Sequence, residues 1–261
     1  MGKTTVFFRN DDVNVMEPGL VETTDLLLER GVPVSHAVEP ANLAPETASW
    51  LLAQAADGVE IIQHGYAHAR HDVGEFGGNR GAADQEADLR AGLAVMRDTF
   101  GDAFFPAMSF PFGAYNEHSI PLLDRLGYPV VSCHWRHQFS RRVYYGLGRM
   151  LGKGRWLGRH VSHHLRMYPG TGVREISVAI SPIVRYFPGQ GPTACRFMGP
   201  DSFAEVFRRC RRAVPVVGIV LHHRFHAGAR ELRLLGEYVD ILEREDVAFG
   251  TIRGIHEGLG S

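Results

Sequence analysis

The sequence is poor in cysteine and has no long hydrophobic run. Its 261 residues include only three cysteines, Cys133, Cys195 and Cys210, which are scattered and odd in number. This pattern excludes a disulfide scaffold and a cysteine-based zinc knuckle, and it is typical of a reducing compartment. No apolar run approaches the roughly 18 residues that cross a membrane. The first residues also lack the apolar core of a secretory signal, so we expect a cytoplasmic protein.

The glycine pattern of a dinucleotide-binding fold is also missing, because no G-x-G-x-x-G follows the first apolar segment. Strand-like and helix-like segments instead alternate along the chain. Strands are expected at 4–8, 32–38, 59–62, 104–110, 128–132, 216–221 and 247–252, and helices at 17–30, 45–57, 82–100, 116–126, 202–213 and 231–244. Such alternation is typical of a parallel sheet with helices outside. We therefore expect one α/β domain over residues 1–261, a closed or incomplete barrel.

Acidic residues are absent from residues 125–174, although the whole chain is nearly neutral, with a net charge of −1. This segment holds 10 of the 28 basic residues, which leaves 18 basic against 29 acidic residues elsewhere. We expect an insertion at about 136–200 with a basic surface that meets an anion. The alternative is a solvated loop region whose charges pair with acidic neighbours.

Histidine, the commonest metal ligand, is abundant, with 14 copies. His64 and His68 follow the third predicted strand and are four residues apart. If the chain turns helical there, both imidazoles lie on one face and can hold one metal ion. Asp11 and Asp12 follow the first strand and can supply a carboxylate ligand and a second carboxylate that faces a metal-activated water. Taken alone, either pair could instead be a surface pair or a helix cap.

Further polar groups follow other predicted strands. The turn Pro111-Phe112-Gly113 comes after strand 104–110, Trp135 after strand 128–132, and His222-His223 after strand 216–221. Because the carboxyl ends of parallel barrel strands share one rim, we expect all these groups to meet around one site.

In this order and spacing, the motifs resemble the polysaccharide deacetylase superfamily (carbohydrate esterase family 4, the NodB-like deacetylases) over roughly residues 4–252. The resemblance implies a distorted (β/α)7 barrel and metal-dependent hydrolysis of an N-acyl or O-acyl group. It also implies a divalent ion, with Zn²⁺ favoured over Co²⁺, Ni²⁺ or Mn²⁺. The resemblance implies that Asp12, His64 and His68 are the metal ligands. It implies that Asp11 is the general base and His222 the general acid. The Phe112 peptide N–H, within the Pro111–Gly113 turn, would bind the oxyanion, and Leu221 and Trp135 would line an acyl pocket.

The sequence departs from the family pattern at several places. The third motif normally reads Arg-Pro-Pro-Tyr/Phe-Gly, and here it is Ser109-Phe110-Pro111-Phe112-Gly113. The arginine that braces the catalytic aspartate is missing there, and we hypothesise that Arg9 replaces it. The first motif reads Arg-Asn-Asp-Asp-Val instead of Thr-Phe-Asp-Asp-Gly, and Cys133-His134-Trp135 is the nearest match to the fourth. His223 is an alternative to His222 as the acid.

Without a secretion signal, the expected substrate is a soluble or lipid-linked amino-sugar precursor of surface polysaccharide, not a finished polymer. Carriers of such sugars are anionic diphosphates, so Arg155 and Arg159 are expected to bind phosphate. Trp156 and Leu157 could instead bring the chain into peripheral contact with the inner membrane. A deformylase or cyclic-amide hydrolase, and a non-catalytic glycan- or metal-binding protein, remain alternatives. No nucleic-acid partner is expected, and the oligomeric state is not indicated.

Overall fold

The computed structural model describes residues 3–135, 163–187 and 194–260, together with the single positions 143, 147, 150 and 151. The predicted phosphate-binding residues Arg155 and Arg159, like Trp156 and Leu157, lie outside these residues. The strands are β1 (Thr5–Val13), β2 (Val34–Val38), β3 (Val59–His64), β4 (Phe104–Ser109), β5 (Val130–Val131), β6 (Arg174–Glu175), β7 (Val178–Ile180), β8 (Ile183–Tyr186), β9 (Cys195–Phe197), β10 (Val216–Leu221) and β11 (Ala248–Phe249). The longer helices are α1 (Pro18–Glu29), α2 (Pro45–Gln54), α3 (Ala82–Phe100), α4 (Ser119–Arg125), α7 (Pro200–Ala213), α8 (Ala229–Arg244) and α9 (Ile252–Gly258). Single 3-10 turns include η4 (Pro111–Gly113) and η5 (His223–Phe225).

The main sheet is parallel and curls back on itself. Its order is β6-β5-β4-β3-β2-β1-β10-β7, with β11 paired to β1. The two ends of this order, β6 and β7, are halves of one segment, which pairs with β5 through its first half and with β10 through its second. Between them, the N–H groups of Ile176 and Val178 donate to the Val131 and Cys133 carbonyls, both at 2.9 Å. Counted as one strand, β6/β7 completes a circuit of seven, which confirms the predicted distorted (β/α)7 barrel. This closing strand lies within residues 136–200.

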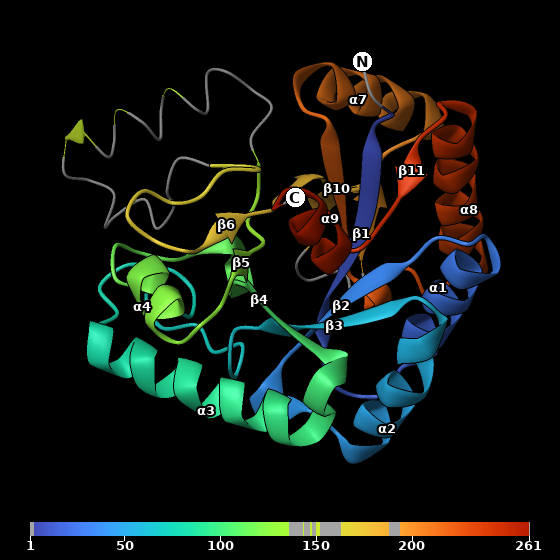
Figure 1. Cartoon of the computed structure of the whole chain (residues 1–261). Helices are drawn as coiled ribbons and strands as arrows, with labels where there is room; N and C mark the ends of the chain where they lie inside the picture. The colour runs from blue at the N-terminus through green and yellow to red at the C-terminus, as the bar shows by residue number, and fades with distance from the viewer. Residues whose placement is uncertain are drawn as a thin grey trace.

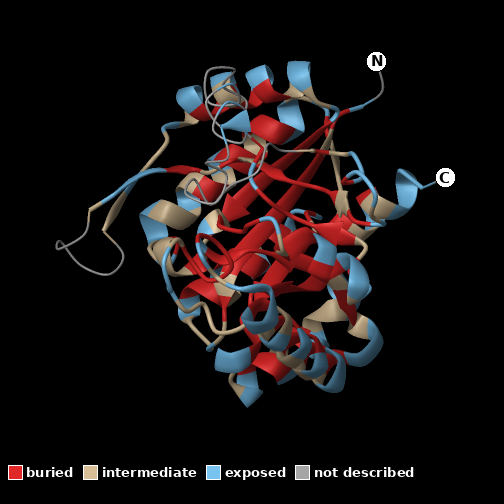
Figure 2. Ribbon diagram, turned by 90° about the vertical axis from the view of Figure 1, so that its left-hand side faces the viewer, coloured by how far each residue is buried: buried red, intermediate tan, exposed pale blue. Residues whose placement is uncertain are grey.

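The helices surround the sheet (Figure 1). Alternate residues of each strand therefore face either the helices or the barrel interior. Val6 and Phe8 belong to the large cluster shared with the helices, whereas Phe7 joins a smaller cluster with residues from β2, β3, β4, β5, β7 and β10, which is the interior. A side chain at Gly218 would overlap the Phe7 ring, so Phe7 fills the barrel at this level. Figure 2 shows the central strands of the barrel buried, with exposed residues on the outer helix faces.

The amino end of the barrel is closed by α9, which begins where the strand predicted over 247–252 ends. Only Ala248–Phe249 is a strand, and Ile252 and Ile255 of α9 join the interior cluster. The buried Glu60 of β3 accepts hydrogen bonds from the N–H groups of Ile252 and Arg253, at 3.0 and 2.7 Å. The first N–H groups of a helix need acceptors. For α9, Glu60 on the distant strand β3 provides them, and a sequence pattern cannot show such a contact.

None of the described helices is both long and apolar enough to cross a bilayer.

Candidate metal centre and active site

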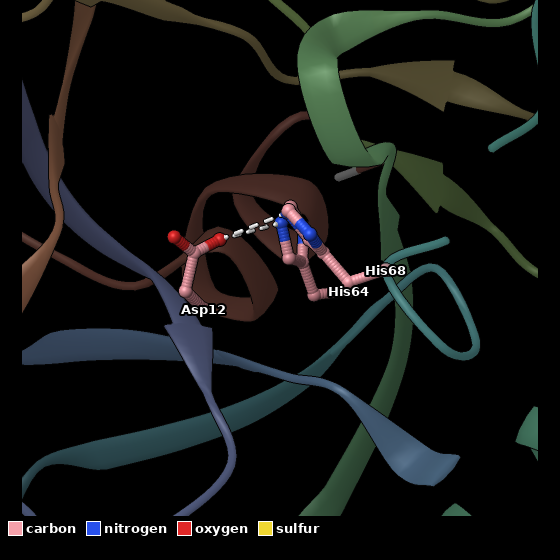
Figure 3. Close-up of side chains that lie close together, drawn as sticks. All are labelled: Asp12, His64 and His68. Atoms are coloured by element: carbon pink, nitrogen blue, oxygen red, sulfur yellow. Dashed lines mark ion pairs between the residues drawn. The ribbon is translucent and has the colours of Figure 1, made fainter. Parts of the chain in front are cut away.

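Three side chains from β1, β3 and the loop after β3 meet at the carboxyl end of the barrel. The Asp12 Oδ1 atom lies 3.3 Å from His64 Nε2 and 3.2 Å from His68 Nε2. The three donor atoms lie within 4.8 Å of one another, and Figure 3 shows both imidazoles directed at the carboxylate. Two imidazole nitrogens and one carboxylate are a common ligand set for a catalytic divalent ion that keeps open positions. The three predicted ligands are thus brought together, and their chemistry fits a metal.

The imidazoles converge through a loop and not through the helix that their spacing had indicated. No helix follows β3; Gly65 and His68 instead have positive φ values of 58° and 52°. The fully buried Glu75 holds this loop by accepting hydrogen bonds from the N–H groups of Tyr66 and Ala67. A side chain at Gly65 would overlap the Glu75 carboxylate. Sequence reasoning missed Glu75, since no motif marks an acid whose partners are backbone amides.

Ser109 orients the first histidine. The Nδ1 atom of the buried His64 lies 3.1 Å from both the carbonyl oxygen and the hydroxyl of Ser109. Donation from Nδ1–H to the carbonyl leaves the Nε2 lone pair facing Asp12, which is the usual arrangement behind a metal-bound histidine. Burial lowers the pKa of His64, but the negative charges of Asp11 and Asp12 outweigh burial and raise it.

Asp11 is held by a buried arginine on its own strand. The Arg9 Nε and Nη2 atoms donate to the two Asp11 carboxylate oxygens at 2.7 and 2.8 Å. Arg9 is 1% exposed, and its Nη1 atom crosses the barrel to the Ser132 carbonyl and hydroxyl at 2.6 and 2.9 Å. Burial alone would raise the pKa of Asp11, but the Arg9 charge beside it keeps the pKa below its ordinary value. Arg9 therefore contacts Asp11 as hypothesised, while Ser109, at the usual arginine position, contacts His64.

The two adjacent histidines after β10 face different surroundings. The fully buried His223 has its Nδ1 atom 3.2 Å from Asn10 Nδ2 and its Nε2 atom 3.3 Å from Glu17 Oε2. His222 is instead within electrostatic reach of both Asp11 and Asp12, and its Nδ1 atom has no hydrogen-bond partner among the described residues. Burial holds the pKa of His222 below its usual value. The role of His222 as the acid, with His223 as the alternative, stays a prediction.

The Asn10 side chain holds His223 in this position. Its Oδ1 atom accepts the backbone N–H of His223 at 2.9 Å, and its Nδ2 atom lies 3.1 Å from Nδ1 of His36 on β2. One amide therefore ties β2, β1 and the end of β10 together where Asp11, Asp12 and His222 emerge. Sequence reasoning did not single out Asn10, and only its departure from the family motif marked it.

The predicted turn at Pro111–Gly113 forms η4 beside the metal ligands. Phe112 has a positive φ of 59°, a strained conformation for a bulky residue. Its ring centroid lies 4.5 Å from that of His68, and the Arg70 guanidinium lies 5.7 Å from the Phe112 ring centroid. Pro111 is buried, and Gly113 also has a positive φ of 59°. The oxyanion role of the Phe112 N–H stays a prediction.

Leu221 and Trp135 are buried at 0% and 9% exposure and both belong to the large cluster. Their predicted role in an acyl pocket is not tested by this burial and stays a prediction.

An antiparallel hairpin of β8 and β9, absent from the sequence predictions, adds a tyrosine to the site. The Tyr186 ring lies 5.3 Å, edge-on, from the Phe225 ring of η5, which lies 6.3 Å from the His222 ring. Burial raises the pKa of Tyr186 to about 12, and the nearby Asp12 and Asp11 charges contribute to the shift. Its hydroxyl therefore lies within electrostatic reach of both carboxylates.

The chain was compared with known proteins. The family model described as polysaccharide deacetylase matches residues 2–131, which include Asp11, Asp12, His64 and His68. A search of curated proteins gives no match. A Mycobacterium smegmatis structure assigned to the polysaccharide deacetylases is 18% identical with a TM-score of 0.68, covering 100% of this chain and 91% of that chain. PuuE allantoinase is 12% identical with a TM-score of 0.67, covering 97% and 89%. A family 4 acetyl xylan esterase from Clostridium thermocellum, solved with a cobalt ion, is 12% identical with a TM-score of 0.61, covering 98% and 92%. These likenesses show a shared fold, and together with the family model they establish that the chain belongs to the polysaccharide deacetylase superfamily, the NodB-like deacetylases.

Proposed function

We propose that the protein is a metal-dependent hydrolase that removes the N-acetyl group from an amino sugar. One observation carries this proposal. A two-histidine, one-aspartate set lies beside a second carboxylate that a buried arginine keeps charged, and the half-buried His222 stands within electrostatic reach of both carboxylates. Membership of the family supports carbohydrate deacetylase activity.

Asp12, His64 and His68 would hold the ion, for which we propose Zn²⁺. When bound, the ion supplies Lewis-acid chemistry, polarising an acyl carbonyl and lowering the pKa of water. Asp11 stays ionised because of Arg9 and accepts the proton of the attacking water. His222 donates a proton to the departing amine; its lowered pKa makes the protonated imidazole a better proton donor than free histidine. The Phe112 N–H donates to the developing oxyanion.

The substrate that we propose is an amino sugar linked to a nucleotide or lipid diphosphate, processed in the cytoplasm as a precursor of surface polysaccharide. The support is the run of 10 basic and no acidic residues over 125–174. Arginine matches phosphate geometry with two parallel hydrogen bonds. Charge reversal at Arg155 and Arg159 should raise KM for a diphosphate-linked sugar and leave KM for the free sugar unchanged. Reversal of the exposed Arg90 on α3 is the matched control.

The experiment that tests the function combines metal analysis of the purified protein with acetate release from N-acetylated sugars, free and diphosphate-linked. We expect one bound divalent ion, acetate release that a chelator abolishes, and an Asp11→Asn variant that keeps metal but loses turnover. An Asp12→Ala variant should lose both. Metal binding without turnover on any acylated sugar would contradict the proposal and favour a non-catalytic binding protein.

A cyclic-amide hydrolase is the second candidate, because the PuuE allantoinase structure matches this chain with a TM-score of 0.67, against 0.68 for the Mycobacterium smegmatis structure. A panel with formylated amines and cyclic amides, assayed beside the acetylated sugars, separates these reactions.

A further inference from the structure

Two aromatic side chains stand exposed in the described part of the chain. Phe112 is 40% exposed and Tyr186 is 46% exposed. Every other phenylalanine, tyrosine and tryptophan within residues 3–135, 163–187 and 194–260 is buried or intermediate. Large apolar side chains left in water often mark a surface that binds something. Both of these lie at the site already described, which points to a ligand there and not to a scattered surface feature.

The two rings lie on different sides of the barrel mouth. Phe112 follows β4 and packs against His68, whereas Tyr186 packs against Phe225, which follows β10. In the sheet order, β3, β2 and β1 separate β4 from β10 in one direction. In the other direction, β5 and the β6/β7 strand separate them. Because the sheet closes, positions three or four strands apart among seven stand across the mouth from each other. Asp12 and His64, on β1 and β3, lie between them.

Each ring is held in place by a neighbour. Phe112 is flanked by the His68 ring at 4.5 Å and by the Arg70 guanidinium at 5.7 Å, and its strained backbone fixes where the side chain starts. Tyr186 meets Phe225 edge-on at 5.3 Å, a favoured aromatic geometry. Val184, two residues earlier on β8, is also exposed. The charges of Asp12 and Asp11 reach the Tyr186 hydroxyl.

We propose that Phe112 and Tyr186 form an aromatic clamp that holds a pyranose ring over the metal centre, with Tyr186 determining which sugar is accepted. This inference rests on the proposed function and names the part of the substrate that the site grips. A pyranose has two chemically different surfaces, a face of C–H groups and a rim of hydroxyls. The C–H face packs on an aromatic ring, while the rim stays within reach of polar groups such as the Tyr186 hydroxyl. A rigid ring positions the attached acyl group with little loss of conformational freedom.

The test uses the full chain loaded with Zn²⁺ and two probes, N-acetylglucosamine and its β-1,4-linked dimer. Binding is measured by saturation-transfer NMR and calorimetry, and KM and kcat by acetate release. We expect Tyr186→Ala to weaken binding and raise KM by roughly five- to tenfold, the size of one lost aromatic contact, with kcat little changed. Tyr186→Phe should restore binding to within about twofold, which separates stacking by the ring from hydrogen bonding by the hydroxyl. The matched control is Phe187→Ala, on the next residue, whose side chain lines a cavity of about 460 Å³ beside α8 and not the metal centre.

Equal binding by the wild type and Tyr186→Ala overturns the clamp, and so does an equal loss in Phe187→Ala. Failure of the wild type to bind either probe also overturns it. Binding of the sugars that depends on Tyr186 but brings no acetate release supports the clamp and contradicts the proposed reaction, so the two failures are distinguishable. Thermal unfolding at the same temperature in all variants shows that the hairpin has not collapsed.

Discussion

Replacing Arg9 by methionine removes the guanidinium while keeping a long side chain inside the barrel. Arg9 makes two hydrogen bonds to Asp11, at 2.7 and 2.8 Å, and two to Ser132, at 2.6 and 2.9 Å. Removing one partner of a buried ion pair leaves the other charge uncompensated, which costs about 3–5 kcal/mol. For a chain of this size, that loss corresponds to a fall in Tm of roughly 6–20 °C. We expect this fall in metal-loaded protein.

The Arg9→Met substitution should also shift the pH dependence of activity towards alkaline pH. Burial raises the pKa of Asp11, and in the wild type the Arg9 charge overcomes that effect. Without the guanidinium, burial dominates and the pKa of Asp11 rises above its ordinary value. The proposed base is then partly protonated near neutrality. Arg9→Met should therefore lose activity at pH 7 and regain part of it as the pH rises. In the wild type, the loss of activity caused by protonation of Asp11 should occur only at acid pH.

A second substitution tests whether the location of the arginine matters. In Arg9→Met/Ser109→Arg, the guanidinium returns to the position that the family motif uses, and the Ser109 backbone carbonyl oxygen that His64 contacts is kept. We expect partial recovery of both Tm and the pH profile. Arg90→Met is the control, because its exposed pair with Glu86 should contribute less than about 1 kcal/mol. An Arg9→Met variant within about 1 kcal/mol of the wild type, with an unshifted pH profile, would refute the reasoning.

Three further outcomes are expected. Burial lowers the pKa of His36 to about 3, of His223 to about 4 and of His226 to about 3; the unfolded chain takes up these protons below about pH 6.5. Stability should therefore fall as the pH drops from about 6.5 towards 4, by about 1.4 kcal/mol per pH unit for each histidine, and His36→Gln should flatten the slope of Tm against pH by about a third. Gly218→Ala should destabilise the protein by about 1–3 kcal/mol in urea unfolding, because the added methyl overlaps the ring that fills the barrel; unchanged unfolding would mean that the interior has room. Glu75→Ala should weaken metal affinity about tenfold or more in a competition titration with a chelator, since it releases the loop that carries the second histidine ligand; an unchanged affinity would show that the loop holds its shape without the carboxylate.

Local patterns predicted the elements whose boundaries depend on their own residues. The helix 82–100 and the strand 216–221 have the predicted bounds, because an amphipathic period and an uninterrupted apolar run define them. The metal ligands also converge as predicted, since strand ends in a barrel share one rim. What failed depends on partners far along the chain. The helix α9 needs Glu60, some 190 residues earlier, and no helix was predicted there; the strand predicted over 247–252 is confirmed only at Ala248–Phe249.

The site also combines residues that local spacing predicts with features that depend on distant partners. Asp12, His64 and His68 could be read from spacing, but the route between the histidines could not, because Glu75 shapes the loop through backbone amides. The closing strand β6/β7 consists of two very short paired stretches, which a period-two pattern does not resolve. Tyr186 lies within electrostatic reach of the carboxylates, and no pattern within the hairpin sequence shows this.

The pairing of β1 has a consequence for how the chain is made. Its six register partners on β10 run from Thr5 opposite Val216 to Asn10 opposite Leu221, so the first strand waits for one that is synthesised about 210 residues later. At roughly 5–20 residues per second, this delay lasts about 10–40 s, during which one edge of β1 lacks its final partner. A bare strand edge is a template for wrong pairing. The nascent chain therefore has its metal ligands, all within residues 12–68, well before it has His222 and the strand that pairs with β1.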